Sequence, residues 1–80
     1  MPEVVAGPEV SADEREVARR LLATMAQLPP AQRKPLVLRE VYGYEYAEIA
    51  ALLGRPVGTV QAAVHRGRRA LRAALDQQGI

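Results

Sequence analysis

The sequence predicts an all-α fold, a small four-helix domain that ends in a helix-turn-helix. Apolar residues recur at three- and four-residue steps, and prolines and glycines stand at the joints between the periodic stretches. Ala50, Gly54 and Val60 also have the spacing of a helix-turn-helix. The motif needs a small residue where two helices touch, a glycine in a left-handed turn, and a β-branched residue that fills the gap. An ordinary helical hairpin is the alternative.

Length and composition narrow the class of protein. Eighty residues make one small domain, and without Trp or Phe the core must consist of Leu, Val, Ile, Ala and three Tyr. The absence of Cys excludes disulfides and thiolate metal sites. We find no apolar run of membrane-spanning length and no signal peptide, so we expect a cytoplasmic protein without a membrane partner.

The first helix is expected at residues 12–27, after a loose lead-in over residues 1–10. The domain itself is therefore expected over residues 11–80. Ser11 and Glu14 have the spacing of a capping box, in which each side chain binds the backbone N–H of the other residue. One apolar face follows, made of Val17, Ala18, Leu21, Met25 and Leu28.

The second helix is expected at residues 30–42. Pro30 suits a first helical turn, where its missing N–H is not needed. Pro35 lies close enough to that turn to predict a late start or a slight kink rather than a break. Gly43 is placed to close the helix in the left-handed conformation.

The third and fourth helices are expected at residues 46–53 and 57–75. Gly54 closes the third, and the turn over residues 55–58 leads into the fourth. Residues on the apolar rows of the four helices should be the most deeply buried: Leu21, Leu36, Ile49, Leu53, Val60, Val64 and Leu71.

The fourth helix has two chemically different faces. Its apolar stripe contains Val57, Val60, Val64, Leu71 and Leu75. The opposite side carries His65, Arg66, Arg69 and Arg72, and between residues 55 and 75 there are five arginines and no acid. Such concentrated positive charge neutralises phosphates, so nucleic acid is the first candidate partner.

Pattern alone leaves more than one role open for several residues of the fourth helix and the turn before it. Arg55 and Thr59 stand at the helix start, where they bind a phosphate or simply cap the helix. His65 is a groove contact or an exposed residue, and Arg69 and Arg72 are expected on backbone phosphates. Arg68 lies near the packed edge and is expected either on DNA or paired with an acid such as Glu40 or Glu48.

An enzyme is argued against by the inventory of reactive groups. The chain has one His, one Ser and no Cys, and it shows no paired carboxylates, phosphate-binding glycine loop or metal-ligand spacing. We therefore expect no catalytic residue, no cofactor and no metal.

The stretch LPPAQRKPLVLREVYGYEYAEIAALLGRPVGTVQAAVHRGRRAL resembles region 4, the C-terminal promoter-reading domain, of extracytoplasmic-function sigma factors of bacterial RNA polymerase. The resemblance covers residues 28 to about 75. It implies a domain that places its last helix in the major groove of the −35 promoter element, with Arg66 at a basic position used against DNA. It also implies docking on the flap of the polymerase β subunit and, commonly, sequestration by an anti-sigma factor.

Two departures from the family pattern stand out. The family usually has a basic residue, Ser and often Arg after GTV, whereas this chain has Gln61, Ala62 and Ala63. This change predicts either weak binding by the isolated domain or a different −35 sequence, since Gln suits adenine and an Ala methyl suits thymine. The family's larger N-terminal domain is also missing, so these residues are a fragment of a longer factor or a stand-alone relative.

Two further hypotheses about the function stay open. One is a stand-alone transcriptional regulator with a LuxR-like output domain, although PVGTV and LPPAQR favour the sigma factor. The other is a protein-interaction module that has lost DNA reading through Gln61-Ala62-Ala63 and mainly binds polymerase or an anti-sigma factor.

Overall fold

The computed structural model describes residues 11–79, and these form four helices and no strand. The helices are α1 (Ala12–Ala26), α2 (Pro30–Glu40), α3 (Tyr46–Leu53) and α4 (Val57–Gln77). The all-α fold is confirmed, and each helix ends within two residues of its predicted limit. The expected lead-in over residues 1–10 lies outside the described residues, so the domain limits remain a prediction.

Local chemistry explains where α1 and α3 begin. At α1, the Ser11 hydroxyl accepts from the Glu14 N–H, and the Glu14 carboxylate accepts from the Ser11 N–H, both at 3.1 Å. These bonds to Ser11, first that to its backbone N–H, lower the pKa of Glu14. At α3, the Glu45 N–H donates to Glu48 Oε1 at 2.7 Å, in the arrangement of a capping box. The capping box predicted for α1 is thus confirmed.

Proline and glycine act at the helix limits largely as expected. Pro30 is the first residue of α2, and Gly43 and Gly54 are left-handed, with φ of +74° and +66°. Pro35 lies inside α2 and is buried, yet the helix continues to Glu40 without a break. The late start of α2 that Pro35 suggested is wrong, because five residues of helix precede it.

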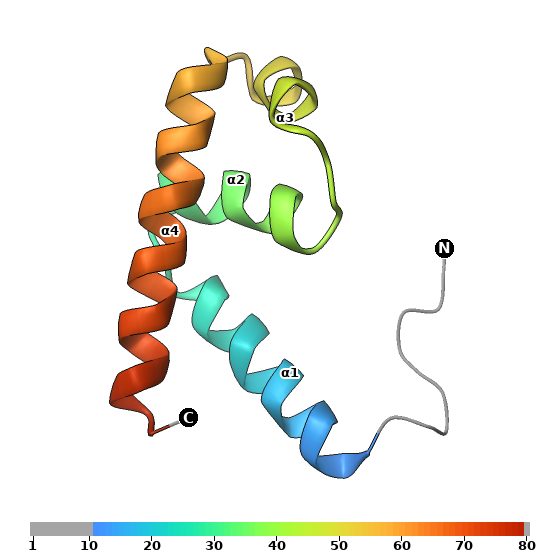
Figure 1. Cartoon of the computed structure of the whole chain (residues 1–80), viewed down its shortest axis with the longest axis vertical. Coiled ribbons are helices and arrows are strands. Elements are labelled where there is room, and N and C mark those ends of the chain that lie inside the picture. The colour runs from blue at the N-terminus through green and yellow to red at the C-terminus, as the bar shows by residue number, and fades with distance from the viewer. Residues whose placement is uncertain (1–10, 80) are drawn as a thin grey trace.

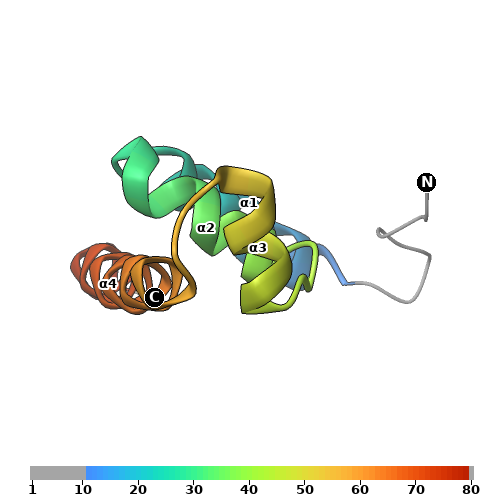
Figure 2. The same ribbon diagram turned by 90° about the horizontal axis from the view of Figure 1, so that it is seen from above.

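In Figures 1 and 2, α4 is the longest element, and the other three helices lie on one side of it. α2 and α3 lie beside its N-terminal half, and the end of α1 meets it near its middle. Since the two views agree, one face of α4 is left without a covering helix.

The core lies where α2 and α3 meet α4. Four residues predicted to be buried are fully so, namely Leu36, Ile49, Val60 and Val64. Leu21, Leu53 and Leu71 were expected to match them but are only partly buried at the core's rim. Buried residues outside that prediction include Thr24, Met25, Leu28, Pro35, Ala50 and Ala63.

Three residues expected on packed stripes are exposed instead, namely Val17, Ala18 and Val57. Val17 is 52% exposed because the first turns of α1 extend away from the other helices, as Figure 1 shows. Val57 is 40% exposed because it is the first residue of α4, one turn before the buried Val60. A helical stripe is buried only where a neighbouring helix reaches it.

Candidate nucleic-acid interface

The helix-turn-helix is built from α3, a short turn and α4. Gly54 ends α3 in the left-handed conformation, and the N–H of Arg55 donates to the Ala50 carbonyl at 3.0 Å. Ala50 and Val60 both belong to the buried core cluster, together with Ile49. The three motif residues therefore perform the roles predicted for them, and the turn presents the start of α4 at the surface.

The uncovered face of α4 carries most of the residues that the sequence predicted for DNA contact. Each of the following is exposed: Gln61, Ala62, His65, Arg66, Arg69 and Arg72. At 1.5 Å per residue this surface is about 15 Å long between positions 62 and 72. That length suits an element lying along a nucleic-acid groove.

Ala63 lies on the opposite side of α4 from this surface. It is buried, as is Gly67, where a Cβ atom would lie 3.3 Å from Leu36 Cδ2. The expectation that Gln61, Ala62 and Ala63 together change the contacts with DNA stays a prediction. Only Gln61 and Ala62 of that run are exposed.

Arg68 is turned toward α2 and bound there. Its Nε donates to Glu40 Oε1 at 3.0 Å, and its Nη2 donates to the same oxygen. This carboxylate raises the pKa of Arg68. Of the two acids proposed from the sequence, Glu40 and not Glu48 is the partner.

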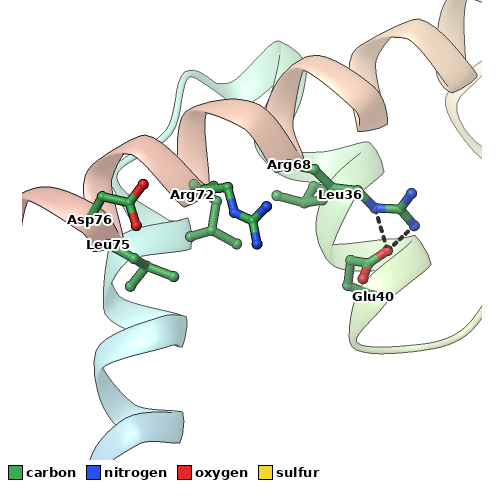
Figure 3. Close-up of a pocket in the computed structure, with 7 residues that line it drawn as sticks. Leu36, Glu40, Arg68, Arg72, Leu75 and Asp76 are labelled. Carbon is green, nitrogen blue, oxygen red and sulfur yellow. Dashed lines mark hydrogen bonds and ion pairs between the residues drawn. The ribbon is translucent and has the colours of Figure 1, made fainter. Parts of the chain in front are cut away.

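Two hollows adjoin this ion pair. The first, about 270 Å³, lies between α2 and the C-terminal half of α4, with Leu36, Leu71 and Leu75 among its walls. Figure 3 shows the Arg72 guanidinium between Leu75 and the Arg68–Glu40 pair, so Arg72 stands at the edge of the uncovered face, on the side of α2. The second, about 410 Å³, is lined by His65, Arg68, Arg69 and Arg72. With no acid among its lining residues, this second hollow favours an anionic ligand.

Arg55 and Thr59 flank the N-terminus of α4, and both are exposed. The N-cap position of α4 is occupied by Pro56, and no side chain makes a capping hydrogen bond there. Thr59 therefore does not cap the helix. Backbone N–H groups of a first turn lack intrahelical partners and carry partial positive charge. The two side chains therefore border a place that suits a phosphate.

A further groove lies on α2, where residue patterns predicted no ligand site. It measures about 330 Å³ and is lined by Arg33, Lys34, Val37, Leu38 and Leu53. Its walls come from two helices, which is why periodicity within either one does not reveal it. Residue patterns do not single out Arg39 of α2 either, because the residues that it contacts all follow this helix.

Residues 11–79 contain neither a metal-binding cluster nor a membrane-spanning helix. This part of the chain holds no group of three or more His, Cys, Asp or Glu side chains placed to bind a metal ion. None of its helices is long and apolar enough to span a membrane.

Comparison with known proteins adds an independent observation. Residues 18–71 match the family model described as Sigma-70, region 4. The chain is 40% identical over 65 residues to the ECF RNA polymerase sigma factor SigE of Mycolicibacterium smegmatis, covering 81% of this chain and 25% of that protein. It is 36% identical over 67 residues to the ECF RNA polymerase sigma-E factor of Escherichia coli K12, covering 84% and 35%. The chain thus spans only a quarter to a third of these relatives.

Proposed function

Because the chain belongs to the sigma-70 region 4 family, we propose that it binds the −35 element of promoter DNA and directs RNA polymerase to promoters. One observation carries the proposal: the helix-turn-helix leaves one face of α4 uncovered, and that face is basic. A recognition helix needs such a face, since phosphates supply most of the affinity and base edges supply the specificity. The family match also favours this function over the LuxR-like alternative.

The proposed contacts divide into two groups along α4. Residues nearer the N-terminus of a recognition helix reach base edges, so we assign Gln61, Ala62, His65 and Arg66 to the major groove. Arg55 and Thr59 at the helix start, and Arg69 and Arg72 farther along, are assigned to backbone phosphates. Arg68 is not assigned to DNA, because Glu40 occupies its guanidinium.

A second surface supports a protein partner. The groove on α2 has apolar walls from Val37, Leu38 and Leu53 and cationic residues Arg33 and Lys34 at its edge. Apolar grooves of this kind accept an amphipathic helix. We propose it as the docking site for the polymerase β flap, and an anti-sigma factor that covered it would compete with polymerase.

The chain is proposed to act by binding alone, in the cytoplasm, without a cofactor or catalytic step. The named relatives are sigma factors, and no catalytic activity is indicated by their names. The alternative is a helix-turn-helix module that mainly binds protein. The absence of a basic side chain at Gln61 and Ala62 favours that alternative.

One experiment separates DNA reading from protein binding. Duplexes that bind the chain are selected from a random-sequence pool at low salt. Fluorescence anisotropy then compares the selected duplex, a scrambled duplex and a β-flap peptide. Tighter binding of the selected duplex supports −35 reading. Equal affinity for both duplexes, together with binding of the peptide, would instead support the protein-interaction module.

A further inference from the structure

We propose that Arg39 is a positioning residue that sets where α3 lies against α4, and thereby how the helix-turn-helix presents its reading face. Its effect on DNA reading rests on the function proposed above, whereas its effect on α3 does not. Nothing in the sequence pattern indicates this role, because Arg39 lies on α2, outside the motif.

Three consecutive residues at the N-terminal end of α3, Tyr44, Glu45 and Tyr46, contact the Arg39 side chain. Its Nη1 donates to the Tyr44 carbonyl at 2.9 Å and lies 3.5 Å from Glu45 Oε1. Its guanidinium carbon lies 4.6 Å from the centroid of the Tyr46 ring. One planar cation thus binds a carbonyl, a carboxylate and an aromatic face, a combination that Lys does not reproduce.

Two of these three contacts contribute most of the stabilisation. Glu45 is 77% exposed in its side chain, so its ion pair contributes little. The Arg39 side chain is only 29% exposed, its bond to the carbonyl is charge-assisted, and its guanidinium stacks on the Tyr46 ring. We therefore attribute the positioning to the carbonyl and the ring.

The segment held by Arg39 is connected directly to the core of the helix-turn-helix. The Glu45 carbonyl accepts the first α3 bond from the Ile49 N–H at 3.0 Å, and the Glu45 N–H donates to Glu48 at 2.7 Å. Ile49 is fully buried in the same cluster as Val60 of α4. A shift of residues 44–46 would therefore move Ile49 relative to Val60.

Amide hydrogen exchange tests the positioning directly, without DNA. Arg39→Ala and Arg39→Lys are compared with the parent chain and with Arg33→Ala, a matched control. Arg33 lies on the same helix and also donates to a carbonyl, that of Ala26, but on the side of α1. We expect exchange at Ile49, relative to Val64, to rise roughly tenfold in both Arg39 variants, as loss of a charge-assisted bond predicts, and to stay unchanged in Arg33→Ala.

The ratio of the exchange rate at Ile49 to that at Val64 separates positioning from a general loss of stability, since global unfolding raises both rates together. A ratio that stays at the parent value in Arg39→Ala would overturn the proposal. So would full rescue by Arg39→Lys, because charge alone would then suffice.

DNA binding tests the consequence for reading. Loss of positioning should weaken binding of the selected duplex roughly tenfold, leave the scrambled duplex nearly unchanged, and leave the salt slope unchanged. An equal loss on both duplexes with a slope lower by about one would show that Arg39 contacts a phosphate, which overturns the proposed effect on reading. If the parent chain itself does not discriminate between duplexes, the proposed function fails, and hydrogen exchange alone decides the role of Arg39.

Discussion

Arg68 of α4 is held by Glu40 of α2, although the two residues stand 28 positions apart in the sequence. The pair withdraws one of five arginines in the basic stretch from the face that is free to meet a ligand. Both side chains are partly exposed, at 47% and 39%, so the pair itself contributes little to stability. Its larger effect is on the distribution of charge.

Releasing Arg68 should strengthen DNA binding without sequence preference. Glu40→Gln removes the carboxylate, so we expect tighter binding of both selected and scrambled duplexes and a salt slope steeper by about one. The free energy of unfolding of Glu40→Gln should be lower than that of the parent chain by about 0–1 kcal/mol. Salt-dependent anisotropy measures the first effect. Asp13→Asn, an equal charge change on α1, is the control, and an identical gain there would mean that net charge alone is responsible.

Arg66 and Arg72 should respond differently to truncation. If Arg66 contacts a base, Arg66→Ala should cost about 1–3 kcal/mol of binding and relax preference at one position of the duplex. Arg72→Ala should weaken all duplexes alike and lower the salt slope by about one, as loss of a phosphate contact does. Arg19→Ala on α1 serves as control. A uniform loss in Arg66→Ala would reassign Arg66 to the backbone.

The packing of α3 on α4 should depend strongly on Ile49. Its side chain is fully buried, and truncation to Ala should lower the free energy of unfolding by about 2–5 kcal/mol. Leu52→Ala on the same helix removes a side chain that is 62% exposed and should cost far less. Thermal melts followed by circular dichroism compare the two, and equal melting temperatures would contradict the described core.

The close approach of α2 and α4 should depend on Gly67. A side chain there meets Leu36 and the Gln32 carbonyl within 3.4 Å, so Gly67→Val should destabilise the fold by about 1–3 kcal/mol. Gly58 lies in the same helix with no neighbour within 4 Å of a Cβ atom, so Gly58→Ala should stabilise it, by up to about 1 kcal/mol. Denaturant unfolding measures both, and a stabilising Gly67→Val would show that α2 moves freely.

Acid should remove the contribution of Glu16 to the stability of α1. Hydrogen bonds from Arg19, then from Arg20, lower the pKa of Glu16 from 4.5 to about 2. Because the folded-state pKa is the lower one, the stabilisation is present above pH 4.5 and is lost as the pH falls toward 2. Melting temperatures of the parent and Glu16→Gln should therefore differ slightly at neutral pH and converge near pH 2. A constant difference would contradict the assignment.

Most of the helical architecture could be predicted from the sequence. Ser11 and Glu14 mark a helix start by bonds within four residues, and Gly43 and Gly54 mark ends by adopting a positive φ. The basic face of α4 was also predictable, since helical periodicity alone separates it from the apolar stripe.

Predictions failed where a second helix decides the outcome. Leu21 and Leu71 stand on apolar rows but reach only the rim of the core. Ala63 follows the exposed Gln61 and Ala62 in the sequence but is itself buried. Periodicity gives a direction around one helix axis, and it does not say how far a neighbouring helix extends along that axis.

By itself, therefore, the sequence determined four helices, the Ser11–Glu14 cap, the glycine turns and one basic surface. Caps and turns depend on residues within about one turn of each other, and the basic surface depends on the period of a single helix. Only the tertiary structure decided that Glu40 binds Arg68, and that Arg39 holds the residues leading into α3. These pairings depend on the crossing of helices. The packing of buried side chains such as Leu36 against α4 sets that crossing, and no local pattern records it.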